Sequence, residues 1–490
     1  MIVLKFGGTS VADAERVHHA AAIIEAQPAP RAAVVSAAAG VTNLLLEAAR
    51  AAATPAPDDA GMTGGAADAA RQVRGRHHAI AAGIAHEAER LAALAELDQL
   101  HAALDEALAD VAAAGELSPR DSDRIVATGE KAMSVLLAAT LRARGTPAAH
   151  LFTDRLLATD DRFGGARPDR GRTRDQVDAL ARPLLDAGLT LVLTGFIGGA
   201  PDGSTTTLGR GGSDYSATLL GAALDASEVQ IWTDVPGVLS ADPRKVDDAR
   251  VVPQISYDEA QELAHFGAKV LHPRTIRPAV ARGIPVRILS TFASDEPGTL
   301  VTKEATEEEN VKAVTALANL LLLTIDVPEL EDLAACSASV FGALHDDRIE
   351  IVAVSQASSR RRMTYLVDAG DHGGCTRVRA RLRDALEAAE IEAEVGCNED
   401  VALVAAVGHG AAAQPAALAR LLDVLGRAGV PVLSANQQHS NVALTAVVPA
   451  THADKAVRAL HDAFIRPLPA TTRGRRLRRA ELLSETIRVG

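Results

Sequence analysis

Segments typical of strands alternate with segments typical of helices from residue 2 to about residue 301. The first is a short apolar run at 2–6, which ends at Gly7-Gly8 and leads into a helix pattern from about Asp13. Further strand-like runs lie at 31–40, 150–153, 189–198, 228–235 and 284–289. Such alternation is typical of a parallel sheet whose two faces are covered by helices. We therefore predict an α/β fold with one large domain at 1–302.

A charged segment and an internal repeat organise the remainder of the chain. Residues 303–312 read KEATEEENVK, nearly free of apolar residues, and we interpret them as a linker. Residues 349–368 and 430–449 align without gaps, and both have the pattern strand, polar turn, strand. Two copies of a small βαββαβ unit explain this better than one larger domain. We predict small domains at 313–395 and 396–468, with strands open to exchange between them, and a basic tail at 469–490.

The composition limits the partners and the compartment. The 490 residues include 50 Lys and Arg against 63 Asp and Glu, a net charge of −13, which argues against nucleic acid as the main partner. No stretch of about 18 apolar residues lacks a charge or a proline, so we expect no membrane span, and we find no signal-peptide pattern. Cys336, Cys375 and Cys397 are widely spaced, with no metal-ligand or redox pairing pattern. We predict a reduced, cytoplasmic protein, and interpret RGRRLRR at 473–479 as a solvated tail.

The first candidate for chemistry is the turn after the first apolar run, Lys5-Phe6-Gly7-Gly8-Thr9-Ser10. Two glycines let the backbone approach an anion, consecutive N–H groups at a helix start attract it, and Lys5 adds a fixed charge. A tight turn selected only for its backbone angles is the commoner explanation of such a glycine pair. The residue order also differs from a Walker A loop, whose lysine follows its glycines.

A second glycine-rich segment, TLGRGGSD at 207–214, surrounds one arginine and one aspartate. Its backbone can wrap a small anionic ligand, and Arg210 can hold a carboxylate through two parallel hydrogen bonds. Asp214 cannot itself bind phosphate, so its role would be to fix a cationic side chain. Charged residues among so many glycines favour a binding site over a structural loop.

Three further segments carry polar residues whose meaning depends on their context: GEK at 129–131, WTDVPG at 232–237 and FGAKVLHP at 266–273. Glu130 is a candidate partner for a substrate ammonium, although a single glutamate on an amphipathic helix is more often solvated. His272 precedes a proline and has no paired nucleophile, so we interpret it as a packing or capping residue.

Together these segments resemble the aspartate kinase family. KFGGTSV, VSAAAGVTNLL, TGEKAMS, TGFIG, TTTLGRGGSDYSA, WTDVPGVLSADPR and FGAKVLHP occur in the family's order and spacing and cover residues 2 to about 301. The repeat resembles the paired, ferredoxin-like ACT domains that follow the catalytic domain in that family. The resemblance implies the amino-acid-kinase fold and transfer of the ATP γ-phosphoryl group to the β-carboxylate of L-aspartate. The product, 4-phospho-L-aspartate, is the first intermediate toward lysine, threonine and methionine.

The resemblance also implies roles for the matching residues. Lys5 would contact the transferring phosphate, and Asp214 would organise that lysine. Arg210 would bind the α-carboxylate of aspartate and Glu130 its α-ammonium, which would discriminate against a dicarboxylate without an ammonium. Further positions around bound aspartate are Ser36, Thr42, Phe196 and Ser213. The nucleotide would be held by Lys5, Gly7, Gly8, Ser10, Thr233, Asp234, Arg244 and Lys269.

Two details of nucleotide binding follow from the same resemblance. Mg²⁺ would accompany ATP mainly through phosphate oxygens and water, so we expect no protein metal ligand. Leu239 replaces a tyrosine that is common in the family, a change that concerns only the packing of adenine or ribose.

Regulation is expected in the repeat, because the ACT domains of relatives pair between subunits and bind lysine or threonine. We therefore expect a homodimer or homotetramer, with an effector near Gln356, Ser358 and Gln437. SQASS at 355–359 resembles the threonine-responsive and dehydrogenase-fused branches. Those branches usually have a glutamate after the serine pair, where this chain has Arg360. The equivalent position of the second copy is Asn441. Arginine reverses the charge presented to an effector ammonium. Feedback is then lost or retuned, unless the change lies on a non-contacting face.

Two other functions compete with this one. A glutamate, carbamate or nucleoside-monophosphate kinase on the same fold would keep the phosphate loop but not the other motifs together. A catalytically silent amino-acid sensor would have lost Lys5, Arg210 or Asp214, and all three are present. No dinucleotide-binding pattern follows the repeat, which favours a monofunctional enzyme of a housekeeping or a specialised pathway.

Overall fold

The computed structural model describes residues 1–54, 64–268, 273–304, 311–328, 333–357, 362–368, 370, 373–411, 414, 416–437 and 442–465. Most of the predicted linker and all of the basic tail therefore lie outside the described residues. The chain divides into two compact units, Met1–Val238 with Val270–Glu304, and Leu239–Lys269 with Ala305–Gly490. Among the described helices, none is both long enough and apolar enough to cross a membrane.

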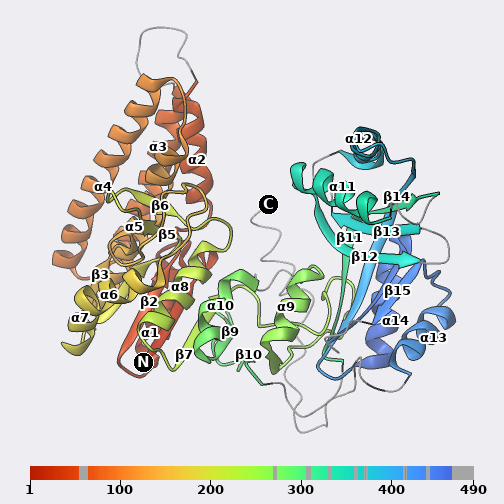
Figure 1. Ribbon diagram of the computed structural model, residues 1–490. Helices are drawn as coiled ribbons and strands as arrows, with labels where there is room; N and C mark the ends of the chain where they lie inside the picture. Colours follow the sequence, from red (N-terminus) through yellow and green to blue (C-terminus); the bar gives the residue numbers. More distant parts are fainter. Residues whose placement is uncertain are drawn as a thin grey trace. The chain divides into compact units, whose positions relative to one another are not determined.

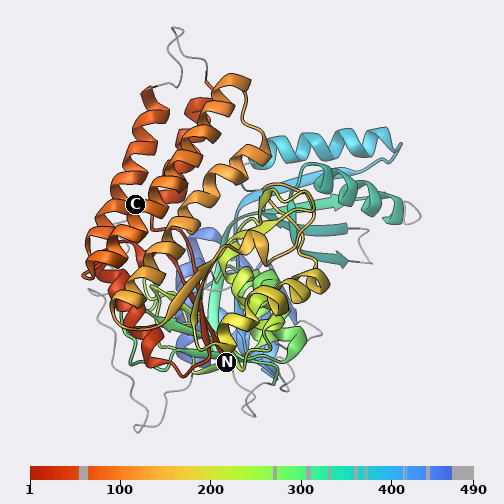
Figure 2. The same cartoon turned by 90° about the vertical axis from the view of Figure 1, so that its left-hand side faces the viewer.

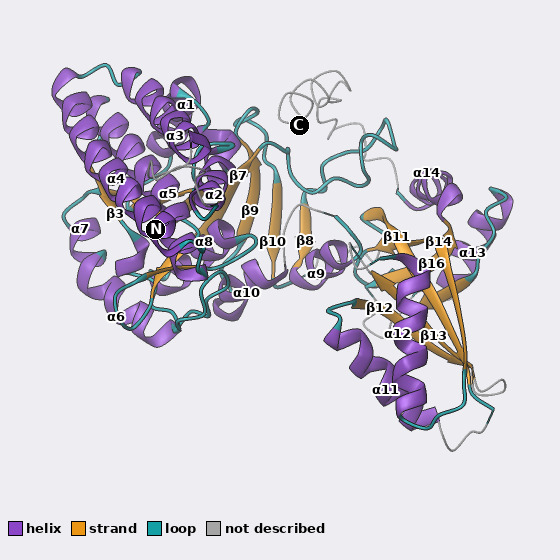
Figure 3. Cartoon of the chain, turned by 90° about the horizontal axis from the view of Figure 1, so that it is seen from above, coloured by secondary structure: helices purple, strands orange, loops and turns teal. Residues whose placement is uncertain are grey.

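The first unit is built on a mainly parallel sheet. Its strands follow the order β3-β4-β2-β1-β7-β9-β10, and every neighbouring pair up to β9 is parallel, whereas β10 is antiparallel to β9. Figure 3 shows β3, β7, β9 and β10 of this sheet in orange with helices around them. The bounds are β1 Ile2–Phe6, β2 Arg31–Val35, β3 Ala148–Leu151, β4 Thr190–Thr194, β7 Glu228–Thr233, β9 Val286–Ser290 and β10 Thr299–Thr302. The predicted α/β fold class is thus confirmed.

The helices of the first unit supply a core rich in alanine, leucine and valine. α5 is central to it: Ser118 caps its N-terminus, Pro119 occupies its first turn, and nearly every residue from Ile125 to Leu141 is buried. α2, α3, α4 and α5 pack against one another, as Figures 1 and 2 show. The bounds are α1 Ala14–Ala26, α2 Val41–Ala52, α3 Gly64–Ala82, α4 Glu87–Ala114, α5 Pro119–Ala143, α6 Arg170–Leu180, α7 Arg182–Asp186, α8 Gly212–Ala223 and α10 Pro273–Arg282, with the 3₁₀ turns η1 Gly8–Val11 and η2 Thr153–Arg155.

One predicted strand is interrupted in the structure. The apolar run at 189–198 forms β4 and then, after Gly195 and Phe196, a separate short ribbon of β5 (Ile197–Gly199) with β6 (Thr205–Thr207). Phe196 has a positive φ of 68°, which a non-glycine residue rarely adopts and which no strand can accommodate. The backbone therefore leaves the sheet at this residue.

The second unit contains an antiparallel sheet in the order β12-β13-β11-β14-β16-β15. The two repeat copies form the antiparallel strand pairs β12–β13 and β15–β16 at opposite ends of this sheet, so each copy contains the two strands that the sequence predicts. The bounds are β11 Ala313–Asp326, β12 Glu350–Ala357, β13 Arg362–Asp368, β14 Glu394–Val407, β15 Ser434–Gln437 and β16 Ala443–Pro449, with β8 Gln254–Ser256, α9 Tyr257–His265, α11 Leu333–Asp346, α12 Gly374–Ala388, α13 Ala417–Arg427, η4 Ala450–His452 and α14 Ala453–Phe464.

Two central strands are shared by both halves of this second sheet. β11 contributes Val314 to the core under α13 and α14, and Leu323 to the core under α11 and α12. β14 does the same with Val404 and Val395. The two cores of this unit therefore do not correspond to two separate stretches of sequence, because each core contains residues of both β11 and β14.

A disulfide joins Cys375 of α12 to Cys397 of β14, two positions with a sequence separation of 22. The prediction that no cysteines pair was therefore wrong. The spacing alone gives no sign of this bond, because it depends on α12 packing across β14. Cys336 is free and buried.

Candidate active site

A cavity of about 570 Å³ opens in the first unit where the strands β1, β2 and β4 end. Carboxyl ends of neighbouring parallel strands meet at one edge of a sheet, which is the usual place for a ligand in such folds. Its lining includes most of the residues that the sequence places around substrate and phosphate: Lys5, Gly8, Ser36, Thr42, Glu130, Phe196, Arg210, Ser213 and Asp214. Segments far apart in the sequence therefore meet around one cavity.

The charge pair of the cavity is formed by Lys5 and Asp214. The Lys5 Nζ lies 2.7 Å from Asp214 Oδ1, and both side chains are at most one-fifth exposed. Lys5 projects from β1, and Asp214 belongs to the first turn of α8. The carboxylate thus fixes the ammonium at the end of the sheet.

The N-terminus of α8 faces the same space. Gly211 caps the helix with a φ of 70°, and Gly209 has a φ of 76°, conformations that glycine adopts without strain. A side chain on Gly212 would come within 2.6 Å of the Phe196 ring. These glycines bring the backbone at the start of α8 to the cavity, and the helix N-terminus favours negative charge there.

Glu130 is the buried acid of the cavity. It lies on α5, it is 3% exposed, and its Oε2 has no hydrogen-bond partner among the described residues. Burial raises the pKa of its carboxyl to about 7, an effect that a hydrogen bond with the Ala37 backbone partly offsets. The neighbouring Gly129 makes this position accessible, since a Cβ there would lie 2.7 Å from the Ala37 side chain. A buried carboxylate with a free oxygen is suited to a cationic group of a ligand.

Asp123, one residue that the sequence analysis did not select, connects α5 to the Arg210 loop. Its carboxylate accepts hydrogen bonds from the Thr207 N–H and hydroxyl, both at 2.8 Å, and from the Gly164 N–H at 2.9 Å. Burial raises the pKa of this carboxyl, and the three hydrogen bonds act in the opposite direction. The segment that carries Arg210 is thereby held to the helix that carries Glu130. The sequence signal was only its place about two helical turns before Glu130 on the same helix.

Phe196 is held in its strained conformation from both sides. Its N–H donates to Ser216 Oγ at 2.9 Å, and its carbonyl accepts from the Leu208 N–H at 2.9 Å. Strain of this kind is common at functional sites, where surrounding contacts stabilise it. Asn43 and the segment 37–40 also line the cavity, although only their neighbours Ser36 and Thr42 were selected from the sequence.

The other predicted nucleotide residues have different surroundings. Thr233 ends β7 beside the turn, where the Gly7 N–H donates to the Trp232 carbonyl at 3.2 Å, and Asp234 accepts from the Thr233 hydroxyl at 3.2 Å. Ser10 is buried, and its hydroxyl lies 2.6 Å from Thr291 Oγ1. Ser10 therefore joins the turn after β1 to the segment that follows β9 and does not line the cavity.

Several predicted residues belong to the second unit. Arg244 forms an ion pair with Asp242 at 2.7 Å, and Leu239 is bridged to Val251. Gln356 and Gln437 are exposed near the ends of the edge strands β12 and β15. The remaining predicted positions Lys269, His272, Ser358, Arg360 and Asn441 lie outside the described residues.

The chain belongs to the amino acid kinase family, whose model matches residues 1–290, and an ACT domain model matches residues 404–464. It is 34% identical over 470 residues to the lysine-sensitive aspartokinase 3 of Escherichia coli, covering 94% of this chain and 98% of that protein. The solved structure of E. coli aspartokinase III with aspartate and ADP covers 95% of this chain with a TM-score of 0.77 and 32% identity.

Several curated relatives are longer than this chain. The bifunctional aspartokinase/homoserine dehydrogenase 2 of Arabidopsis thaliana is 30% identical over 471 residues, which are 94% of this chain but 50% of that protein. The chain thus spans about half the length of these relatives.

Proposed function

We propose that this protein is an aspartate kinase, which transfers the γ-phosphoryl group of ATP to the β-carboxylate of L-aspartate. The observation that carries the proposal is the convergence of Lys5, Glu130, Arg210 and Asp214 on one cavity at the end of the sheet. The likeness to the E. coli aspartokinase structure with aspartate and ADP supports it. The resulting acyl phosphate is 4-phospho-L-aspartate.

The charges of the cavity suit the transfer itself. In the reaction one β-carboxylate oxygen bonds to the γ-phosphorus, while the bond to the bridging oxygen breaks and ADP leaves with that electron pair. The nucleophile is already an anion, so no general base is needed, and the problem is to hold two anions in line. Lys5, fixed by Asp214, would neutralise charge on the moving phosphoryl group, and the α8 N-terminus would add backbone N–H groups.

Substrate selection would depend on Glu130 and Arg210. Arg210 is exposed at the cavity and would pair with the α-carboxylate of aspartate. The unpartnered Oε2 of Glu130 would accept a hydrogen bond from the α-ammonium. Ser36, Thr42, Phe196 and Ser213 would complete the aspartate site. A dicarboxylate without an ammonium would leave Glu130 buried and unpaired, which disfavours its binding.

The nucleotide side of the proposal rests on the turn after β1 and the end of β7. Gly7, Gly8, Thr233 and Asp234 would lie along the phosphates and ribose, with Arg244 and Lys269 supplying further charge. Mg²⁺ would bind mainly through phosphate oxygens and water. The cavity fits this arrangement, because it offers the Lys5 ammonium and the N-terminus of α8 to the negatively charged phosphates.

The ACT region would regulate the enzyme by binding an amino acid. A solved structure of E. coli aspartokinase III, in complex with lysine and aspartate, supports an amino-acid ligand besides the substrate. We place the effector near Gln356, Ser358 and Gln437, and propose that Arg360 retunes or removes the response. The domains at 313–395 and 396–468 would also pair between subunits of a homodimer or homotetramer.

The proposal is tested by incubating the protein with ATP, Mg²⁺, L-aspartate and hydroxylamine and measuring aspartyl hydroxamate, with lysine or threonine added in parallel. Wild type should form hydroxamate and Lys5→Met should not, while Lys303→Met, which changes an exposed lysine of the same unit, should match wild type. Equal activity in wild type and Lys5→Met would refute the proposed site. Absence of product with both aspartate and glutamate would favour a silent sensor.

A further inference from the structure

Four polar side chains meet between α3 and α4, away from the cavity. His77 and His78 lie on α3, and Asp98 and His101 lie on α4, three residues apart and hence on one face of that helix. His77 and His101 are buried, 0% and 3% exposed, whereas His78 and Asp98 are open to solvent. The other buried residues of these two helices are alanine, valine, isoleucine and leucine, so two buried histidines are unusual here.

The buried pair leaves polar atoms without partners. His77 Nδ1 lies 3.0 Å from His101 Nε2, so one hydrogen bond joins the two rings. The other nitrogens, His101 Nδ1 and His77 Nε2, are buried and have no hydrogen-bond partner in the described part of the chain. A buried polar atom without a partner costs stability, and a bound ion or water is a usual explanation.

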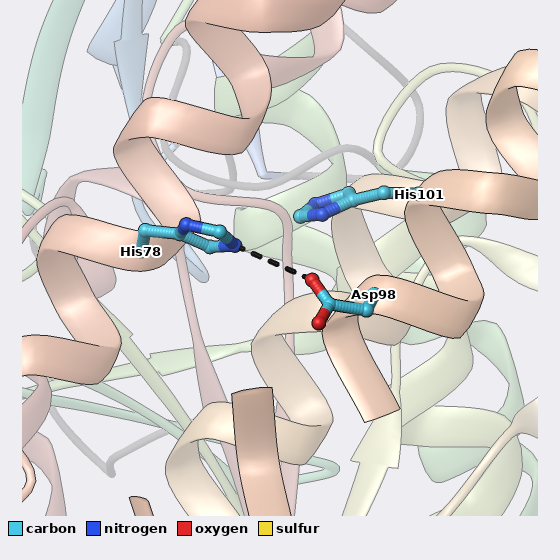
Figure 4. A group of neighbouring side chains, drawn as sticks. All are labelled: His78, Asp98 and His101. Atoms are coloured by element: carbon cyan, nitrogen blue, oxygen red, sulfur yellow. Dashed lines mark ion pairs between the residues drawn. The ribbon is translucent and has the colours of Figure 1, made fainter. Parts of the chain in front are cut away.

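His101, His78 and Asp98 have the spacing of a metal site. One ligand atom from each lies within 4.8 Å of the others, and His78 Nε2 is 3.8 Å from Asp98 Oδ1. In Figure 4 the His78 ring and the Asp98 carboxylate point toward each other, and the His101 ring lies beside them. Two imidazoles and one carboxylate match a transition-metal site and not a magnesium or calcium site, which uses oxygen ligands.

We propose that His78, Asp98 and His101 bind one Zn²⁺-like transition-metal ion that joins α3 to α4. His101 would coordinate through its unpartnered Nδ1, and water would complete the tetrahedral shell on the exposed side. His77 would then act as an outer partner, because its Nδ1 accepts the hydrogen bond from His101 Nε2–H and fixes the ring orientation.

The second group of this kind in the described residues lacks the feature that supports the first. Asp248, His461 and Asp462 of the second unit also bring three ligand atoms together. The Nε2 of His461, however, lies 2.9 Å from Ser240 Oγ, and neither nitrogen of its ring is a buried atom without a partner. We therefore assign the site between α3 and α4 alone.

The location suggests what the ion would do. Arg76, beside His77 on α3, donates to the Ala39 carbonyl at 2.6 Å, and Ala39 lines the candidate active site. An ion that fixes α3 to α4 would also restrain this contact. The site would be structural, and its occupancy does not depend on the proposed kinase activity.

The test uses untagged full-length protein, treated with a chelator and then equilibrated with Zn²⁺ or Co²⁺ without nucleotide. Bound metal is measured by mass spectrometry, and the cobalt protein by its visible absorption. Wild type should bind one ion per chain and gain thermal stability. His78→Gln and Asp98→Asn, both at exposed side chains, should weaken binding at least tenfold, whereas His86→Gln, an exposed histidine at the start of α4, should not.

His77→Phe separates the outer partner from the ligands. It should keep the stoichiometry but weaken binding about tenfold, as the loss of an outer hydrogen bond does at other metal sites. The proposal is overturned if wild type binds neither ion saturably, or if His78→Gln and Asp98→Asn bind as tightly as wild type.

Discussion

The ammonium of Lys5 and the carboxylate of Asp214 lie 2.7 Å apart across more than two hundred residues of sequence. Lys5 lies near the end of the first strand and Asp214 in the first turn of α8, so the pair forms only when the sheet and that helix have assembled. Because both side chains are largely buried, the ion pair has a fixed geometry that an exposed pair would lack.

Asp214→Asn should lower kcat for hydroxamate formation by about 10²- to 10³-fold. The substitution removes the carboxylate that orients the Lys5 ammonium toward the phosphoryl group. The KM for ATP should change much less, since the backbone N–H groups remain. Asp202→Asn, an exposed aspartate paired with Arg120 in the same unit, serves as control. A loss confined to KM would show that the pair binds the nucleotide and does not act on the transfer.

Aspartate binding should depend on the ionisation of Glu130, whose pKa burial raises to about 7. Only the ionised carboxylate attracts the substrate ammonium, so affinity should fall about tenfold for each pH unit below 7 and level off above it. Glu130→Gln should bind weakly at every pH without this dependence. Calorimetric titrations from pH 5.5 to 8.5 measure it, and an identical profile in both proteins would contradict the assignment.

Glu130 should also lower stability at high pH. The pKa of this carboxyl in the folded protein lies above the ordinary value of 4.5, so the folded state binds the proton more tightly than the unfolded state. The resulting contribution to the free energy of unfolding is fully present below pH 4.5 and is lost as the pH rises through 7. Glu130→Gln should therefore be more stable than wild type at pH 8, by about 3 kcal/mol at most, and unfold at a higher temperature, with a smaller difference at pH 5. Scanning calorimetry at the two pH values tests the sign.

Arg210→Lys should raise the KM for L-aspartate about 10- to 100-fold and leave the KM for ATP near that of wild type. Lysine keeps the charge but cannot form two parallel hydrogen bonds to a carboxylate. Arg71→Lys, at an exposed arginine of α3 paired with Asp68, is the matched control. Equal effects on both KM values would place Arg210 at the nucleotide.

The Cys375–Cys397 disulfide should stabilise the second unit by about 3 kcal/mol, because it closes a loop of 22 residues in the unfolded chain. Cys375→Ser should lower the urea midpoint of that unit in oxidising buffer. Under reducing conditions the difference from wild type should vanish. A midpoint that is the same in both proteins and both buffers would mean that the bond contributes nothing.

The elements that lead into the cavity could be predicted because each has a local signal. The apolar run at 2–6 with its two glycines, and the alternation that follows, determine β1 and its parallel neighbours. Glu130 illustrates the limit, since one acid on a helix gives no sign of burial, and its role was implied only by the resemblance to the aspartate kinase family. Phe196 was selected as a substrate position, but its positive φ, which ends β4, depends on Ser216 and Leu208.

Other features depend on tertiary contacts that no local pattern records. Asp123 accepts hydrogen bonds from Thr207 and Gly164, which are both distant in sequence. The Ser10 hydroxyl is hydrogen-bonded to the hydroxyl of Thr291. The bond between Cys375 and Cys397 requires the packing of α12 on β14. The sharing of β11 and β14 between two cores is likewise invisible in the repeat, because neither strand belongs to the aligned copies.

The most direct measurement follows ³¹P resonances of a mixture of the protein, ATP, Mg²⁺ and one acceptor. With L-aspartate the account predicts an acyl phosphate signal that appears together with ADP, and no such signal with succinate, which lacks the ammonium that Glu130 would bind. ADP formation without an acyl phosphate, or an equally fast reaction with succinate, would contradict the assignment of this cavity as an aspartate kinase site.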